Sequence, residues 1–420
     1  MLLSFVITFL LGVSAFASAQ NETARKLFAD KKSAIVQVRI IDLTSGSKST
    51  IGSGFLVDDQ GLIATNYHVV QLAVSKPEQY RIEYLSYTNE TGDLELVDVD
   101  AINDLALVKA KDFGKQPLVL ATQAPDVGVS VYALGNPLDL GLTVVPGTYN
   151  GINKAHYYPR VHFTGSLNPG MSGGPTLDEQ GRIVGINVST AGNQISFLVP
   201  VERLHRLVEE YKTRISPITD FKQRIGVQLL EDQQKKFSLM LAQDWQSIAL
   251  GEARVLAELT PFVKCWGGSN ASSTEAQFLS AERSCRSEDS IFLSSQFSSG
   301  VTEYQFFWLE ADKLNSWQFY SYYQSLFSEF VAGNRGGKND VSDFACDNNF
   351  VDGSDAGRKT KAVICVRAYK EYPQLYDMLF LQGTVDDGER AFISHFTLAG
   401  VSRENGLAFS RKFMEVSQWQ

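Results

Sequence analysis

A series of short apolar runs between residues 33 and 200 is the feature that most limits the fold of this chain. The runs are rich in Val and Ile, alternate in part between apolar and polar residues, and end at Gly, Asp or Pro. Such runs are typical of β-strands. Because they follow one another closely without helices between them, they favour barrels or a sandwich over β-α-β units. We therefore expect an all-β unit over this range.

A helical pattern follows at residues 200–212 (PVERLHRLVEEYK). Pro200 stands at its start, and Leu204, Leu207 and Val208 fall on one face. We interpret the next residues, 214–220, as a linker. A chain of 420 residues is long enough for more than one domain, so we predict a first domain over 20–213 and a second over 221–420.

The second half mixes two patterns. Residues 221–259 are expected to be helical, with Gly226 and Gly251 as points of interruption. Residues 315–330, capped by Asn315 or Ser316, carry an aromatic stripe that we interpret as core rather than as a ligand platform. The stripe consists of Phe319, Tyr323, Phe327 and Phe330, and the strand-like runs are 302–311, 361–369, 376–384 and 390–398. We expect an α+β domain without a motif that indicates a reaction.

The first 19 residues have the pattern of a secretory signal. Leu2 to Phe16 is apolar, and Ala17-Ser18-Ala19 is a small-x-small cleavage site. The apolar stretch is shorter than the ~20 residues that a membrane-spanning helix needs. No later apolar run is long enough to cross a membrane either. We expect cleavage after Ala19, a periplasmic or secreted protein, and no integral membrane segment after signal removal.

The charge balance bears on the class of partner. The net charge is −9 and the isoelectric point is near 5.2. Nucleic-acid binding requires clustered Lys and Arg to neutralise phosphates, and no long basic run is present. The sequence therefore predicts no nucleic-acid partner, and nothing in it specifies an oligomeric state.

All cysteines fall in the second half, at Cys265, Cys285, Cys346 and Cys365. An even number in an exported chain indicates disulfides, and four cysteines allow three pairings. Pairing Cys265 with Cys285 and Cys346 with Cys365 closes local loops between neighbouring strands, so we favour it over a Cys285–Cys346 bridge. Buried free thiols are the alternative. No Cys or His pair has zinc-ligand spacing, so we expect no metal site.

Residues 167–177 (LNPGMSGGPTL) surround Ser172 with glycine. Asn, Pro, Gly and Ser are ordinary turn residues, so a surface turn is one reading. The other is a nucleophile on a tight loop whose backbone N–H groups face the oxygen of an attacked carbonyl. The choice depends on whether a base and an orienting acid exist elsewhere.

Among five histidines, His68 is the candidate base. It follows two apolar runs joined by an Asp-Gln-Gly turn, so we expect it at the end of a hairpin strand, held rigidly near the surface. The candidate acid is Asp104, which opens an alternating run and therefore lies at a strand entrance. Asp98 and Asp100 lie inside an alternating segment and are expected to face solvent.

Four blocks make a resemblance specific. They occur in the order GSGFLVDDQGLIATNYHVV, DLALVKA, LGNPLDLGLTVVPGTYNGI and SLNPGMSGGPTLDEQGRIVGINVS. In that order they resemble the blocks of trypsin-like serine proteases of the bacterial HtrA/Deg type, over residues 30–210. The resemblance implies an all-β double six-stranded, chymotrypsin-like barrel fold followed by the α+β domain. It also implies the chain order His, Asp, Ser, which His68, Asp104 and Ser172 match.

The resemblance further implies the roles of neighbouring residues. The N–H groups of Gly170 and Ser172, with Met171 between them, would form an oxyanion hole. Leu167 would lie near the primary specificity pocket, with Gln194, Ile195 and Ser196 along one side. No acidic residue falls at these positions, so we expect a small or medium apolar residue before the scissile bond. Residue 171 is often Asn in this family and is Met here.

The function expected from these features is that of a serine endopeptidase acting on unfolded or exported proteins or peptides without a cofactor. One alternative is a catalytically silent binding or chaperone protein that kept the scaffold. A second places the main activity in residues 221–420. That domain does not resemble the PDZ modules usual in HtrA proteins, and we expect it to recruit substrate or to regulate.

Overall fold

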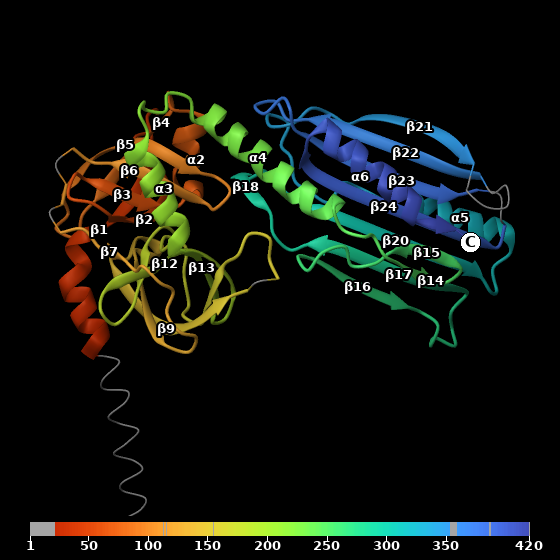
Figure 1. Ribbon diagram of the computed structural model, residues 1–420, viewed down its shortest axis with the longest axis horizontal. Helices are drawn as coiled ribbons and strands as arrows, with labels where there is room; N and C mark the ends of the chain where they lie inside the picture. Colours follow the sequence, from red (N-terminus) through yellow and green to blue (C-terminus); the bar gives the residue numbers. More distant parts are fainter. Residues whose placement is uncertain are drawn as a thin grey trace, which may run out of the picture. The chain divides into compact units, whose positions relative to one another are not determined.

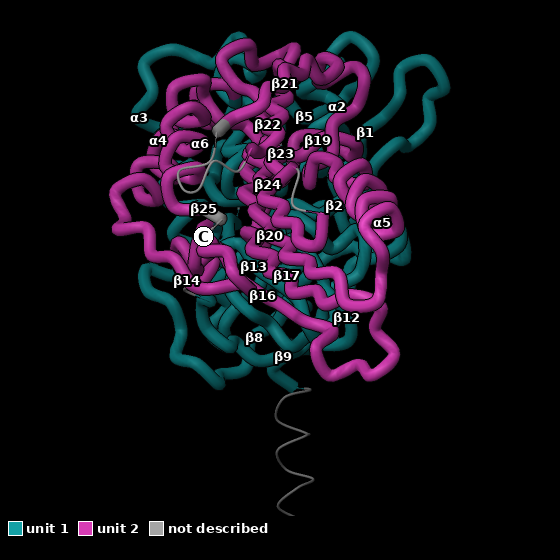
Figure 2. Tube along the Cα trace, turned by 90° about the vertical axis from the view of Figure 1, so that its right-hand side faces the viewer, with its two compact units in different colours: residues 1–154, 158–225 teal, residues 155–157, 226–420 magenta. Residues whose placement is uncertain are grey.

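The structure is a computed structural model, and it describes residues 22–111, 113–114, 116–153, 155–352, 359–385 and 388–419. The predicted signal segment, residues 1–19, lies outside this part of the chain. The described residues form two compact units (Figure 2). Unit 1 is drawn from Met1–Lys154 and Tyr158–Ile225, and unit 2 from Ala155–Tyr157 and Gly226–Gln420.

The first half of unit 1 is a closed six-stranded antiparallel barrel (Figure 1). Its strand order is β1-β2-β3-β6-β5-β4. The strands are β1 (Ile35–Asp42), β2 (Lys48–Leu56), β3 (Leu62–Thr65), β4 (Tyr80–Leu85), β5 (Thr91–Asp100) and β6 (Leu105–Lys109). Val36, Val38 and Ile40 alternate along β1 and are at most 1% exposed, as expected where one face of a strand lines a barrel core.

The second half of unit 1 forms another six-stranded ring. Its order is β11-β8-β9-β10-β13-β12, and pairing of β11 with β12 closes it. The strands are β8 (Ser130–Gly135), β9 (Thr143–Ile152), β10 (Val161–Phe163), β11 (Pro175–Leu177), β12 (Arg182–Gly192) and β13 (Ile195–Pro200), with the two-residue β7 (Val119–Leu120) added parallel to β12. The predicted double-barrel fold is confirmed.

Helices in unit 1 are few. Residues 22–31 are helical, η1 (Lys32–Ala34) and η2 (Pro137–Asp139) are 3-10 turns, and the α-helices are α2 (Tyr67–Ser75) and α3 (Val201–Thr213). The buried residues of α3 include Leu204, Leu207 and Val208, which confirms the predicted apolar face. Residues 214–220 are neither helix nor strand.

Unit 2 is built on an antiparallel seven-stranded open sheet in the order β16-β17-β20-β24-β23-β22-β21. Its strands are β16 (Val263–Ser269), β17 (Phe278–Ser287), β20 (Thr302–Ala311), β21 (Ala345–Asp352), β22 (Lys359–Ala368), β23 (Tyr376–Thr384) and β24 (Arg390–Val401). Smaller pairings join β14 (Ser247–Leu250), β15 (Ala253–Leu256) and β25 (Gln418–Trp419), and β18 (Ile291–Ser294) with β19 (Phe297–Ser299). The predicted α+β character of this half is confirmed.

Helices cover both faces of this sheet. Along β24, Phe392 and Phe396 belong to one core cluster and Ile393 to another, because successive side chains on a strand point to opposite faces. The first cluster includes residues of α4 (Phe221–Leu241) and α6 (Arg403–Val416), and the second includes residues of α5 (Ser316–Ser328). The three helices are visible around the sheet in Figure 1.

Helix α5 begins as predicted. The side chain of Asn315 accepts a hydrogen bond from the Gln318 N–H, and the Gln318 side chain accepts one from the Asn315 N–H, which is a capping box. Phe319 and Tyr323 are buried, so the aromatic stripe is part of the core. The remaining members, Phe327 and Phe330, pack against the same cluster.

The expectation of a helix over residues 221–259 is right only for its first half. Gly226 lies inside α4 without interrupting it, whereas residues 247–256 form the hairpin β14–β15. Gly251 turns this hairpin with a φ of 57°, and a Cβ there would meet the Trp308 ring at 2.2 Å. Contact with the sheet therefore selects strands where the local pattern favours a helix.

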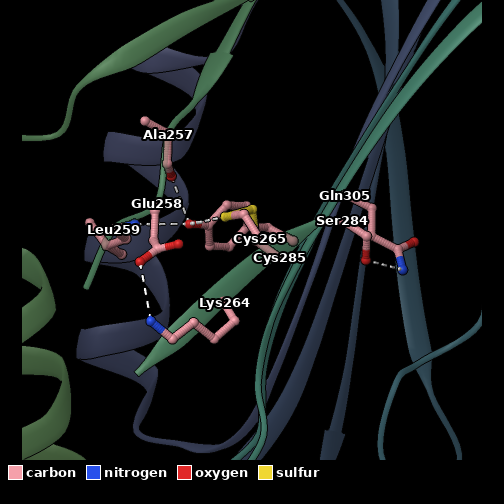
Figure 3. Close-up of a disulfide and its surroundings, with 9 residues drawn as sticks. Ala257, Glu258, Leu259, Lys264, Cys265, Ser284, Cys285 and Gln305 are labelled. Carbon is pink, nitrogen blue, oxygen red and sulfur yellow. Dashed lines mark hydrogen bonds and ion pairs between the residues drawn. A yellow bond between two sulfur atoms is a disulfide. The ribbon is translucent and has the colours of Figure 1, made fainter. Parts of the chain in front are cut away.

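Both predicted disulfides, Cys265–Cys285 and Cys346–Cys365, are present. Each joins residues that face each other across an edge strand and its neighbour, β16 with β17 and β21 with β22. Next to the first bridge, the Tyr304 hydroxyl donates to the Ala257 carbonyl (2.8 Å) and accepts from the Leu259 N–H (3.1 Å; Figure 3). The two edges of the sheet are thus covalently fixed.

Across the residues described, we find no helix with the length and apolar character required to traverse a membrane.

Candidate active site

His68 lies in the first turn of α2, not at the end of a hairpin strand as expected. The β2–β3 hairpin ends at Thr65, and Asn66 is the N-cap residue of the helix. The apolar residues after His68 follow a helical pattern, because Val69, Val70, Ala73 and Val74 are all buried. The short helix therefore places the imidazole beside the barrel core, with 28% of its side chain exposed.

Asp104 lies directly before β6, at the strand entrance that the alternating pattern predicts. Its Oδ2 is 2.7 Å from Nδ1 of His68, and its Oδ1 accepts a hydrogen bond from the backbone N–H of His68 at 2.9 Å. Asp104 is 7% exposed. The carboxylate therefore holds both the ring and the backbone of the histidine.

The contact with Asp104 shifts the pKa of His68. Burial lowers the pKa of His68, but the negative charge of Asp104 and its hydrogen bond raise it by more, while Arg160 lowers it. The net pKa of His68 is raised above its usual value of 6.5. A histidine with a raised pKa is a stronger base once it is deprotonated.

The expectation that Asp98 faces solvent is wrong. Asp98 is 0% exposed and pairs with Arg214 (2.6 Å) and Arg224 (3.4 Å). Two guanidinium groups compensate the buried carboxylate, and they come from segments whose contact with β5 no local pattern shows. Asp100 is half-buried and accepts hydrogen bonds from the backbone and side chain of Asn103.

Ser172 lies on the loop between β10 and β11. Gly170 and Gly173 flank it with φ values of 96° and 83°, a region that glycine adopts readily. A Cβ on Gly170 would lie 2.4 Å from the Asn136 carbonyl oxygen, so this position also lacks room for a side chain. At these two positions glycine therefore permits a tight loop that a residue with a side chain would strain.

The Ser172 loop packs against the strand that leads to His68. The Ser172 carbonyl accepts a hydrogen bond from the Ser53 N–H at 2.7 Å. A Cβ on Gly173 would lie 2.4 Å from Oγ1 of Thr65 and 2.9 Å from the Asn66 nitrogen. Residues from the two barrels therefore meet within the length of one side chain. The Oγ of Ser172 donates to the Val188 carbonyl at 3.3 Å.

The loop presents two unused backbone donors. Met171 donates its N–H to the Asn168 carbonyl at 3.0 Å, so it is already engaged. Within the described part of the chain, the N–H groups of Gly170 and Ser172 have no hydrogen-bond acceptor. These two amides are available to an oxyanion.

The four residues expected at the specificity pocket separate into two pairs. Leu167 and Ser196 are buried, and the Leu167 N–H donates to the Ser196 hydroxyl at 3.2 Å. Gln194 (φ 57°) and Ile195 (44% exposed) lie at the turn between β12 and β13. The structure thus brings together the first pair and leaves the second at the surface.

Two further residues connect the site and were not singled out in the sequence. The Ser53 hydroxyl donates to the Gly170 carbonyl (2.8 Å) and accepts from the Asn136 N–H (2.9 Å). Asn66 donates its side-chain amide to the Asp104 carbonyl at 2.7 Å. Both lie within the first sequence block of the resemblance, but no spacing rule distinguishes them from other polar residues there.

Comparison with known proteins identifies the first half. Residues 52–186 match the family model of the trypsin-like peptidase domain. This part of the chain is thus similar to trypsin-like peptidase domains, and the relatives that it matches are proteases of the HtrA type.

Similar proteins include Serine protease HTRA1 of Xenopus tropicalis, 31% identical over 198 residues, which are 44% of this chain and 42% of that protein. Protease Do-like 1, chloroplastic, of Arabidopsis thaliana is 30% identical over 210 residues, 46% of this chain and 45% of that protein. The chain thus spans less than half the length of these curated relatives. The crystal structure of the serine endoprotease from Yersinia pestis is 26% identical, covers 45% of this chain and 66% of that one, and has a TM-score of 0.40.

Proposed function

We propose that this protein is a serine endopeptidase that uses His68, Asp104 and Ser172 as a catalytic triad. The observation that carries the proposal is the double hydrogen bond from His68 to Asp104, at 2.7 and 2.9 Å, beside the glycine-flanked Ser172 loop. The peptidase-domain match over residues 52–186 agrees with it.

In this mechanism the Nε2 of His68 takes the hydroxyl proton of Ser172 as Oγ attacks the peptide carbonyl. Asp104 fixes the tautomer that carries its proton on Nδ1 and stabilises the imidazolium that forms. The proton then passes to the departing amine, and water hydrolyses the acyl-enzyme by the same route. No cofactor takes part in these steps.

The tetrahedral oxyanion is stabilised by two backbone amides, those of Gly170 and Ser172. Met171 contributes none, because its N–H donates to Asn168. One such donor contributes about 2.7–4 kcal/mol of transition-state stabilisation in related hydrolases. The Ser53 hydroxyl supports this loop through the Gly170 carbonyl.

The substrates are polypeptides with an accessible extended segment, such as unfolded or exported proteins. Leu167 would lie near the primary pocket, as the resemblance implies, and its N–H donates to the Ser196 hydroxyl. Cleavage after small or medium apolar residues follows, since none of the pocket residues is acidic. A peptide library cleaved mainly after Lys or Arg would contradict this preference.

The cellular location is an oxidising compartment, the periplasm or the exterior. Two disulfides join all four cysteines of the chain, and such bonds persist mainly outside the reducing cytosol. Trapping the thiols at cell lysis tests this: free Cys265 and Cys285 in the native protein would contradict it.

Residues 20–213 would carry out the hydrolysis, and residues 221–420 would recruit substrate or regulate. The boundary between the two compact units falls inside α4, after Ile225. No nucleophile or base in unit 2 is required by the mechanism above.

The experiment that tests the proposal compares hydrolysis of an unfolded protein by the full chain with hydrolysis by Ser172→Ala. We expect turnover to fall by at least ~10⁴-fold, since loss of the nucleophile leaves only binding and the oxyanion hole. A matched control is Ser166→Ala, on the same loop. A Ser172→Ala protein that keeps most of its activity would contradict the proposal, whereas a folded wild-type chain without any hydrolysis would support the rival view, a silent binding or chaperone protein.

A further inference from the structure

Helix α2 begins in an unusual way. Asn is among the best N-cap residues because its side-chain oxygen accepts a backbone N–H of the first turn. Asn66 has N-cap dihedral angles, φ −86° and ψ 151°, yet its side chain accepts no such hydrogen bond. The residue thus occupies the capping position without capping the helix.

Asp104 performs the capping instead. Its Oδ1 accepts the backbone N–H of His68, the second residue of the helix, while Oδ2 faces Nδ1 of the same residue. Asn66 in turn donates from Nδ2 to the Asp104 carbonyl at 2.7 Å. These three hydrogen bonds join the start of α2 to the residue before β6 in both directions: Asp104 accepts from His68, and its own carbonyl accepts from Asn66.

The Asp104 backbone needs support in this arrangement. Its φ is 59°, a left-handed conformation that a residue other than glycine adopts only where its surroundings hold it. The hydrogen bond from Asn66 is made to the carbonyl of this same residue. Rotation of Asp104 towards a more common conformation would move that carbonyl and would turn the carboxylate away from the imidazole.

Asn66 is retained at an energetic cost. The residue is 0% exposed, and its Oδ1 has no hydrogen-bond partner among the described residues. A buried unsatisfied polar atom costs about 1–3 kcal/mol. An apolar residue would avoid this cost, so the benefit of Asn66 must come from its Nδ2 donor.

We propose that Asn66 is a positioning residue that holds the backbone of Asp104 in its left-handed conformation and thereby aims the carboxylate at Nδ1 of His68. The proposal rests on the proposed function of His68, Asp104 and Ser172. Asn66 acts on the reaction only through Asp104, because it is buried and makes its hydrogen bond to the backbone of that residue.

The test uses two variants of the full chain. Asn66→Ala removes the donor and empties its space, and Asn66→Leu removes the donor and keeps the space filled without adding a charge. We expect kcat to fall by about 10- to 100-fold in both, as for other residues that orient a catalytic group. KM should stay within about twofold, since Asn66 does not reach the substrate.

A second readout separates positioning from simple loss of stability. The pKa of His68 depends on burial, on Asp104 and on Arg160. Weaker contact with Asp104 lowers it, so the acid limb of the kcat/KM profile should move to lower pH in Asn66→Ala. The downfield Nδ1 proton of His68 in the NMR spectrum should weaken as well. Asn405→Ala removes a buried amide that bonds Gln233 and Gln234 in unit 2, and should change neither readout.

The outcomes distinguish the two proposals. If the wild-type protein shows no hydrolysis that depends on Ser172, the proposed function fails. If the wild type is active and either folded Asn66 variant keeps the wild-type kcat and pH profile per titrated active site, the positioning role of Asn66 is overturned. Lowered stability with unchanged kcat also counts against it.

Discussion

The two units differ in how the edges of their β-sheets are arranged. Unit 1 closes most of its strands into two rings, so each strand of a ring pairs with a neighbour on both sides. Unit 2 has an open sheet, and each of its two edge strands is joined to its neighbour by a disulfide. Covalent bonds thus occur where closure of the sheet is absent.

The two units also differ in the role of their polar side chains and loops. In unit 1, Asp104 bonds His68, the Ser172 carbonyl accepts a hydrogen bond from the Ser53 N–H of the other barrel, and the loops that carry Asp104 and Ser172 contain residues with positive φ. In unit 2, some buried polar side chains connect strands and loops of the sheet. One example is Asp377, which is fully buried and bonded to Arg367, Tyr369 and Asn334. The proposed function assigns the chemistry to unit 1 and the recruitment of substrate, or regulation, to unit 2.

The chain offers a probe that separates the two units. All five tryptophans lie between residues 245 and 419, in unit 2. Tryptophan fluorescence therefore follows the unfolding of unit 2, and hydrolysis follows the integrity of unit 1.

The largest expected effect is that of Asp104→Asn. An uncharged amide cannot hold the required imidazole tautomer, so kcat should fall by about 10⁴-fold. The tryptophan unfolding transition should keep its midpoint, because the change lies in unit 1. Steady-state kinetics and urea unfolding measure the two quantities. Retained turnover would break the assignment of chemistry to this site.

Next is Asp98→Ala, which removes the buried partner of Arg214 and Arg224. Breaking a buried ion pair costs up to about 3–5 kcal/mol, and the cost here is lowered because Arg224 keeps its contact with Glu210. We expect activity to be lost at lower urea concentration, with an unchanged tryptophan transition. Asp100→Ala, which loses only its bonds to Asn103, is the matched control and should cost less. Equal effects of the two changes would show that burial of Asp98 does not matter.

The double change Cys265→Ser and Cys285→Ser tests the edge of the open sheet. The bridge closes a loop with a sequence separation of 20 residues, and its loss should destabilise the unfolding transition of unit 2 by about 3 kcal/mol. Tryptophan fluorescence in urea measures this. Hydrolysis of a short peptide should be unaffected, and the pair Cys346 and Cys365 should behave in the same way. A shift in the activity transition instead would contradict the division of roles.

The smallest expected effect is on how the stability of unit 2 depends on pH. Burial lowers the pKa of Lys236 from 10.5 to about 8, although Asp232 and Asp289 oppose this. The unfolded chain therefore binds more protons between pH 8 and 10.5, so this group makes stability rise with pH there, by roughly 1 kcal/mol per pH unit. Lys236→Met should remove that slope from the tryptophan transition, and Lys235→Met, at an exposed position, should not. An unchanged slope in Lys236→Met would contradict a lowered pKa.

The sequence predicts the barrels well because their strands are short, apolar and separated by turn residues. It predicts α5 equally well, because the aromatic stripe and the Asn315 cap are local signals. The hairpin at residues 247–256 is missed, since contact between Gly251 and Trp308 acts over a long sequence distance. The helical start of α2 is missed for a similar reason: the atom that caps it belongs to Asp104.

In the candidate site, too, local signals could be read from the sequence, whereas long-range contacts could not. Motifs and chain order indicate His68, Asp104 and Ser172. The burial of Asp98 depends on Arg214 and Arg224, which are more than a hundred residues away in sequence. The contacts of Asn66 and Ser53 also become visible only when the two barrels and their loops are in place.

The most direct test of the account is the reaction of the full chain with a fluorophosphonate, followed by mapping of the labelled peptide by mass spectrometry. We predict one adduct per chain on Ser172, no label in Ser172→Ala, and much slower labelling in Asp104→Asn. A folded protein that gains no adduct on Ser172, or gains it equally fast without Asp104, would contradict it.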